Sequence, residues 1–314
     1  IARGRRRARI PAEHAERFIG DVRRIHVGHS SDAEIRGAGG SGGVATAVLH
    51  AAIERGGCGA ACVVGMEKER PWAPDVRLAR TRGELIEASG SKYVLIDTGR
   101  ILAALGGEAG RVAVVGLPCH VRALRRRMAA GRHGNIALIV GLFCGYNMTP
   151  DATDFLLGKA GVRKEEVASL RYRGGPYPGG FLVRTRSGAE RFFPKYCYDA
   201  VNLIFAPGRC AGCGDYMSEL ADLSVGDAWG HGKRSVVSAR TAAGEEALRA
   251  ADVEMEEIAV EELFRMHRHN IRHKKSGDPA GLRAAAWFLR LCGRRIPFGL
   301  LGLMAGARRK ALGR

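Results

Sequence analysis

The chain has 314 residues, of which 46% are hydrophobic and 26% are charged, a globular composition that excludes wholesale disorder. Lys and Arg number 50 against 32 Asp and Glu, and the net charge of +18 favours an anionic partner: a nucleic acid, a phosphate-bearing cofactor, an acidic protein or a membrane surface. Only 6% of the residues are aromatic, which argues against binding of single-stranded nucleic acid by base stacking. Neither a membrane-spanning apolar run nor a signal peptide is visible, so we predict a cytoplasmic protein.

Strands and helices alternate through the first half of the chain, which is typical of a mostly parallel α/β sheet. A basic N-terminal segment (1–30) precedes an expected α/β part (31–165). Within it, the glycine-rich loop RGAGGSGG (36–43) leads into a helix at 44–54. We further predict strands at 60–66, 93–96, 111–115 and 136–143, and helices at 83–88, 101–105, 121–128 and 154–159.

The pattern changes after about residue 165. Short alternating runs at 169–173, 180–186 and 190–194, divided by Gly and Pro, predict antiparallel strands, and another strand is expected at 223–225. We assign these to a smaller α+β part (166–240) that carries a C-x-x-C loop. A helical, basic region (241–314) follows, with a helix at 244–269 and a basic apolar tail from residue 281 that is a candidate for peripheral membrane contact.

Four of the eight cysteines indicate a site. Cys210 and Cys213 form a C-x-x-C pair in a glycine-rich loop, and Cys119 and Cys144 each follow directly on a predicted buried strand. If these strands are parallel, both thiols emerge at the carboxyl edge of the sheet, where open α/β sheets bind ligands. A Cys₄ site suits zinc or an iron–sulfur cluster, and a loop pair closing on a cofactor cleft favours the cluster.

The alternative is that Cys119 and Cys144 are small core residues. For the other cysteines we favour structural roles. Cys58 and Cys62 are expected in the core, Cys197 in the core or a loop, and Cys292 in the core or an interface.

Several segments are candidate anion sites. The glycine run 37–43 offers backbone N–H groups to a phosphate where it enters a helix, although it matches neither the Rossmann fingerprint nor the P-loop, and a flexible turn is the alternative. Lys92, beside Tyr93, is either solvated or able to reach a phosphate or a flavin carbonyl. The basic turn that contains Arg173 and Gly174 has the same two interpretations.

Two candidate catalytic residues lie near these segments. Asp227 ends a predicted strand and either contacts a cofactor or caps a turn. His120 follows Cys119 and either relays a proton or packs against the site. We place His267, His269 and His273 on the surface of a basic helix, because no acidic or cysteine partner accompanies them.

The ordered motifs RGAGGSGGVATA, GSKYV, VVGLPCHVRALRR, IVGLFCGYN, LRYRGGPYPGGF and CAGCGDYMSELADLSVGDAWG resemble the coenzyme F420 hydrogenase/dehydrogenase beta-subunit family over roughly residues 28–235. The resemblance implies FAD, a 4Fe-4S cluster, and hydride exchange with coenzyme F420 as the substrate. It implies Cys119, Cys144, Cys210 and Cys213 as cluster ligands. It also suggests Ser41, Gly42, Gly43, Lys92 and Tyr93 as flavin contacts.

The chain departs from the family pattern at two points. His120 stands where Gln is common, and no C-x-x-C-x-x-C repeat precedes Cys58. We therefore expect an oxidoreductase that passes electrons between F420, or a related two-electron donor, and a partner hydrogenase, dehydrogenase or reductase subunit. The alternative is a non-catalytic electron-transfer subunit of a larger complex. A weaker alternative, which rests on charge alone, is a zinc-stabilised protein that binds nucleic acid or a membrane surface.

Overall fold

The large sheet forms the centre of the molecule. A computed structural model describes residues 17–195 and 197–275. Its large sheet contains β1 (Arg24–Ser30), β2 (Ala60–Met66), β3 (Pro74–Ala79), β4 (Val112–Gly116), β5 (Ile136–Leu142), β9 (Leu223–Asp227), β10 (Ser235–Ala239) and β11 (Val253–Glu257). The strand order is β11-β1-β10-β9-β5-β4-β2-β3. Strands β2, β4, β5 and β9 are parallel to one another, and the strands on either side of them pair antiparallel. The expected α/β class with a mixed sheet is confirmed.

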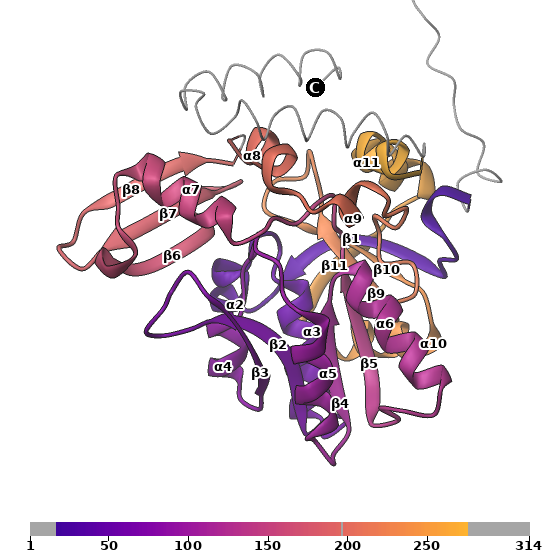
Figure 1. Cartoon of the computed structure of the whole chain (residues 1–314). Coiled ribbons are helices and arrows are strands. Elements are labelled where there is room, and N and C mark those ends of the chain that lie inside the picture. The colour runs from indigo at the N-terminus through magenta and orange to yellow at the C-terminus, as the bar shows by residue number, and fades with distance from the viewer. Residues whose placement is uncertain (1–16, 196, 276–314) are drawn as a thin grey trace, which may run out of the picture.

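The smaller sheet is an antiparallel meander of β6 (Val167–Gly174), β7 (Gly180–Thr185) and β8 (Glu190–Pro194). It lies to one side of the large sheet, next to α7 (Asp151–Ala160) and α8 (Cys197–Phe205) (Figure 1). Its inner face buries Tyr172, Phe181 and Val183 in a core that includes side chains of both helices. The predicted strands at 169–173, 180–186 and 190–194 are therefore confirmed with small shifts of their ends.

Helices cover both faces of the large sheet. Besides α7 and α8, the helices are α2 (Ala33–Ala38), α3 (Val44–Glu54), α4 (Arg82–Glu87), α5 (Thr98–Gly106), α6 (Pro118–Ala129), the short 3₁₀ turn η1 (Lys164–Glu166), α9 (Gly208–Ala211), α10 (Ala242–Ala250) and α11 (Val260–Lys275). The two-residue alternation of β2 directs Ala61 and Val63 toward the core under α3, α4 and α10, and Ala60 and Cys62 toward the core under α5 and α6. None of the helices within the described ranges is long and apolar enough to cross a membrane.

One predicted strand, 93–96, is absent. Its backbone is satisfied locally instead of by a sheet ladder: the Leu95 N–H donates to the Met148 carbonyl at 2.8 Å, and the Asn147 amide donates to the Val94 carbonyl at 2.9 Å. Conversely, β3 was not predicted, because its proline and charged residues obscure a strand that lies at the sheet edge.

Three further expectations change in the structure. The strand expected at 223–225, which we placed in the smaller α+β part, pairs within the large sheet as β9, next to β10, a strand that we did not predict. The basic segment 1–30 contributes β1. The helix expected at 244–269 is interrupted by β11, whose sequence VEMEE pairs with β1. In each case a long-range strand partner decides the outcome, which local periodicity does not reveal. The tail after residue 275 lies outside the described residues.

Candidate functional site

A cavity of about 390 Å³ opens at the carboxyl ends of the parallel strands. Its walls come from the glycine loop before α3, the segment after α4, the ends of β4, β5 and β9, and one face of α11. Ligands of open α/β sheets bind at this edge. Of the residues proposed from sequence, those that line the cavity are Ser41, Gly43, Lys92, Tyr93, His120, Cys144, Arg173 and Asp227; Gly42, Gly174, Cys119, Cys210 and Cys213 do not.

The glycine loop is held firmly against the sheet. The Gly42 N–H donates to the Ser235 hydroxyl at 3.0 Å, and the Ser41 and Ser235 hydroxyl groups are 2.9 Å apart. A Cβ on Gly42 would lie 2.5 Å from the Gly28 carbonyl oxygen, so only glycine fits there. Gly43 caps α3 with a φ of 78°, in the left-handed region. The loop therefore presents the positive end of an 11-residue helix to the cavity, which favours an anionic ligand group.

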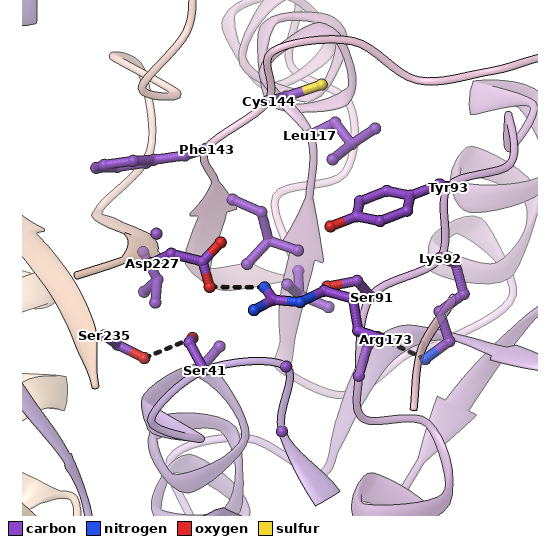
Figure 2. A pocket seen from close by; sticks show the side chains of 18 of the residues that line it. Ser41, Ser91, Lys92, Tyr93, Leu117, Phe143, Cys144, Arg173, Asp227 and Ser235 are labelled. Carbon is purple, nitrogen blue, oxygen red and sulfur yellow. Dashed lines mark hydrogen bonds and ion pairs between the residues drawn. The ribbon is translucent and has the colours of Figure 1, made fainter. Parts of the chain in front are cut away.

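Arg173 and Asp227 form an ion pair inside the cavity. Nη1 of Arg173 donates to Oδ1 of Asp227 at 2.6 Å, and the two side chains are only 4% and 17% exposed. Nε donates to the Pro178 carbonyl at 3.0 Å. Nη2 is buried with no acceptor among the described residues. Figure 2 shows the pair across the middle of the cavity, with Ser41 and Cys144 on opposite sides. The free nitrogen provides a donor for a phosphate or carbonyl oxygen of a ligand.

Lys92 is occupied by the backbone. Its ammonium donates to the carbonyls of Ala88, Ser89 (3.0 Å) and Gly90 (3.1 Å), and so it covers the carboxyl end of α4. Burial lowers the pKa of Lys92 to about 7, and the nearby charges of Arg77 and Arg171 act in the same direction. This side chain thus holds the loop that forms the cavity wall. The adjacent Tyr93 directs its hydroxyl group into the cavity (Figure 2).

Two other predicted residues, Gly174 and His120, make mainly packing and backbone contacts. A Cβ on Gly174 would lie 2.7 Å from the Leu182 Cβ, so this glycine permits close packing of β6 on β7. His120 is 4% exposed, and its Nδ1 accepts from the Leu117 N–H at 3.4 Å at the start of α6. Burial lowers the pKa of His120. A neutral imidazole at the cavity wall can exchange a proton with a ligand.

The four candidate cysteines are electrostatic neighbours. Burial raises the pKa of Cys144 to about 12; the Lys274 ammonium lowers it, and the thiols of Cys210, Cys119 and Cys213 raise it. Burial, Cys210 and Cys213 likewise raise the pKa of Cys119. Like charges within reach of one another produce this effect. The structure therefore brings together thiols that are separated by up to 94 positions in the sequence (Cys119 to Cys213).

Within the described ranges, no group of three or more His, Cys, Asp or Glu side chains has the geometry of a metal site. The four thiols are therefore close to one another but are not arranged around a common metal position. Cys119 lies in the first turn of α6, because the helix begins at Pro118 and not at the expected residue 121. The structural assignment of Cys58 and Cys62 is confirmed by exposures of 5% and 1%. Cys197 is buried as well, and Cys292 lies outside the described residues.

The sequence interpretation missed the contribution of α11. His269, Asn270, His273 and Lys274 line the cavity, and Lys274 also donates to the Cys210 carbonyl at 2.9 Å. The prediction of surface histidines was wrong, since His267 is 1% exposed and packs edge-on against Phe143. The helical spacing of the apolar positions Leu263, Phe264 and Ile271 marks the same buried face and was the available signal.

Comparison with known proteins identifies relatives of this arrangement. Two family profiles of the coenzyme F420 hydrogenase/dehydrogenase beta subunit match the chain: the profile of its N-terminal part matches residues 25–103, and the profile of its C-terminal part matches residues 109–264. The coenzyme F420 hydrogenase subunit beta of Methanosarcina barkeri is 31% identical over 232 residues, which cover 69% of this chain and 74% of the relative.

Two further relatives are matched over different shares of their own length. The coenzyme F420-dependent sulfite reductase of Methanocaldococcus jannaschii is 29% identical over 255 residues, 76% of this chain but only 38% of the reductase. A chain of the F420-reducing [NiFe] hydrogenase complex from Methanosarcina barkeri superposes with a TM-score of 0.67 at 25% identity, and the match covers 82% of this chain and 92% of that one. On the strength of both profiles and these relatives, the chain belongs to the coenzyme F420 hydrogenase/dehydrogenase beta-subunit family.

Proposed function

We propose that this chain is a flavin- and 4Fe-4S-dependent oxidoreductase that exchanges hydride with coenzyme F420, or a related two-electron donor, and electrons with a partner redox protein. One observation carries the proposal. Cys144 lines the cavity and is also the electrostatic neighbour of Cys119, Cys210 and Cys213. A cofactor in the cavity and a cluster on the four thiols would therefore lie next to each other.

Two features of the cavity support binding of a flavin dinucleotide. The unpaired Nη2 of Arg173 and the N-terminus of α3 are suited to oxygen atoms of an anionic or carbonyl-bearing ligand. A Cβ on Gly40 would lie 2.9 Å from the Ser91 hydroxyl, so the glycine leaves room that any larger residue would fill. We assign FAD binding to Ser41, Gly43, Tyr93 and Arg173 directly, and to Gly42, Lys92 and Gly174 through the shape of the cavity wall.

The four cysteines have the donor chemistry of an iron–sulfur cluster. Thiolates are the usual ligands of 4Fe-4S clusters. Burial first, and the neighbouring thiols second, raise the pKa of Cys119 and Cys144, and a bound cationic iron core would offset both effects by favouring the thiolates. When bound, the flavin supplies hydride chemistry and the cluster exchanges single electrons. In this scheme Arg173 orients the flavin, and α11 excludes water from one side of the cavity.

The two candidate catalytic residues have separate roles in this proposal. Asp227 holds the Arg173 guanidinium in place through its ion pair. His120, neutral because burial lowers its pKa, is available to take the proton that accompanies hydride loss from the donor. The relatives support F420 as the donor, because the subunit of Methanosarcina barkeri belongs to a coenzyme F420 hydrogenase.

The second candidate is a non-catalytic electron-transfer subunit. It is favoured by the similarity to one chain of a multi-subunit hydrogenase complex, and by the sulfite reductase, of which this chain spans 38%. Both candidates agree with the free cysteines of the described residues, because thiols stay reduced in a reducing cytoplasm.

Anaerobic purification followed by visible spectroscopy and flavin and iron analysis tests the cofactors. We expect one FAD and about four irons per chain, a ratio set by the 4Fe-4S cluster type. Cys144→Ala should abolish iron binding, whereas the matched variant Cys62→Ala, in the core, should retain it. A colourless, zinc-containing protein would contradict the proposal and favour the zinc-stabilised alternative. Reduction of an artificial acceptor by reduced F420 with the isolated chain separates the enzyme from the passive subunit.

A further inference from the structure

Helix α11 has three faces with different surroundings, and it lies at the upper margin of the described part of the molecule (Figure 1). One face, which includes Leu263 and Ile271, is buried in a core shared with β1 and β10. A second face lines the cavity. The third face carries Arg265, Arg268 and Arg272, whose spacings of three and four residues place them in one row along the helix. We call this row the α11 arginine stripe.

Ion pairs do not neutralise the α11 arginine stripe. Arg265 and Arg272 are exposed, and Arg268 is half-buried. The ion pairs that α11 forms within the described residues lie in its first and last turns and do not include these arginines. Glu261, one turn before Arg265, is acidic, but the three arginines outnumber it, so this face keeps a net positive charge.

The sequence continues the positive charge beyond the described helix. Residues 279–314 begin four positions after Lys275 and contain eight Lys and Arg but no Asp or Glu. Within them, the uncharged run IPFGLLGLMAGA (296–307) lies between two arginines (294–295) and the sequence RRK (308–310). A run of this length is too short to span a bilayer. Apolar residues flanked by basic ones are instead typical of a segment that binds at the surface of an anionic membrane.

We propose that the α11 arginine stripe and residues 279–314 together form a docking surface for a lipid bilayer with anionic headgroups. A membrane interface offers negative charge directly beside an apolar phase, and it therefore suits both the arginines and the uncharged run 296–307. The phosphate backbone of a nucleic acid offers the charge alone. The inference goes beyond the proposed function and does not depend on a bound flavin or cluster.

Docking through this surface leaves the cavity accessible. The helical phase places the α11 arginine stripe on a different side of α11 from Asn270 and His273, which line the cavity. Each Lys or Arg near an anionic bilayer strengthens binding by about fivefold, and salt weakens this attraction. We therefore expect a bound protein whose cavity still faces a soluble ligand.

Vesicle flotation of the purified full chain tests the proposal. The probe is vesicles of phosphatidylcholine with about one third phosphatidylglycerol, and pure phosphatidylcholine vesicles are the reference. We expect the chain to bind the anionic vesicles at least tenfold more tightly than the neutral ones, and to be released by salt. Arg265→Gln/Arg268→Gln/Arg272→Gln, and separately Leu300→Glu/Leu301→Glu, should each weaken binding to anionic vesicles at least tenfold. Thermal melting shows whether the variants remain folded.

The matched control is Arg55→Gln/Arg111→Gln/Arg132→Gln. These exposed arginines lie near the amino ends of β2, β4 and β5, at the opposite edge of the sheet from the cavity, and the charge change is the same as in the α11 variant. An equal loss of vesicle binding in this control would show that net charge is responsible and would overturn the proposal.

Three other results would also overturn the proposal. They are equal binding of the parent protein to neutral and anionic vesicles, unchanged vesicle binding by either variant, and tighter binding of the parent protein to duplex DNA or to an acidic protein than to anionic vesicles at the same ionic strength. Flavin and iron analysis of the same preparations separates the two conclusions, because absence of both cofactors contradicts the proposed function and leaves vesicle binding as predicted.

Discussion

Nη1 of Arg173, at the end of β6, donates to Oδ1 of Asp227, at the end of β9, over 2.6 Å. This contact connects the small sheet to the large sheet within the cavity. Because the carboxylate and the Pro178 carbonyl hold two of the three guanidinium nitrogens, the remaining nitrogen has a fixed direction. The donor for a ligand is thus prepared before the ligand arrives.

Breaking this ion pair should destabilise the fold. In Asp227→Asn the Arg173 charge, whose side chain is 4% exposed, loses its counter-ion, and we expect the free energy of unfolding to fall by about 3 kcal/mol. Urea denaturation of the cofactor-free chain measures the loss. The control Glu190→Gln removes an ion pair with Arg184 in which the side chains are 50% and 60% exposed, and it should cost less than about 1 kcal/mol. Equal losses in the two variants would show that the buried ion pair contributes no more to the free energy of unfolding than the exposed one.

The glycine loop should tolerate no side chain at Gly42. A Cβ there meets the Gly28 carbonyl oxygen and the Ser235 nitrogen at 2.5 and 2.8 Å, both backbone atoms that cannot move aside. We expect Gly42→Ala to lower the free energy of unfolding by about 1–3 kcal/mol and to reduce the bound flavin. Gly37→Ala is the control, since nothing lies within 4 Å of its Cβ and alanine favours α2. Thermal melting and flavin fluorescence give both readouts; a stable, flavin-replete Gly42→Ala protein would refute the expectation.

The stability contributed by Lys92 should depend on pH. Its pKa is about 7 in the folded protein and about 10.4 when unfolded. Between these values the unfolded chain binds more protons, so the free energy of unfolding rises with pH, by up to about 1.4 kcal/mol per pH unit. Lys92→Met lacks this term. The parent protein should therefore gain stability relative to the variant between pH 7 and pH 9 in urea titrations. No gain over this range would show that the three carbonyl acceptors keep the ammonium charged.

Lys274 should tune the cluster that we assign to the four cysteines. Its ammonium donates to the Cys210 carbonyl at 2.9 Å, and its side chain is 8% exposed. Removal of a positive charge disfavours addition of an electron, so Lys274→Met should lower the reduction potential of the cluster. The neighbouring Lys275, which pairs with Glu219, serves as the control. A redox titration followed by electron paramagnetic resonance measures both variants; equal potentials for Lys274→Met and the parent protein would exclude this role.

Local patterns predicted much of the scaffold. The apolar runs of β2, β4 and β5 and the helices α3 and α6 followed from periodicity, since buried parallel strands are continuous apolar segments. The antiparallel strands at the sheet edges could not be predicted from periodicity. The charged β11 and the irregular segment around Val94 depend on partners that lie far away in the chain. Periodicity carries no information about such partners.

By itself, the sequence determined the family, the α/β class and the residue types of the candidate site, because motif order and the chemistry of cysteine, glycine and arginine are local properties. Tertiary structure alone decided which of these residues meet. It placed Cys144 between the cavity and the other thiols, turned Lys92 onto the end of α4, and brought one side of α11 against the cavity. These outcomes depend on long-range packing and on where each backbone polar group finds its partner, which only the folded chain defines.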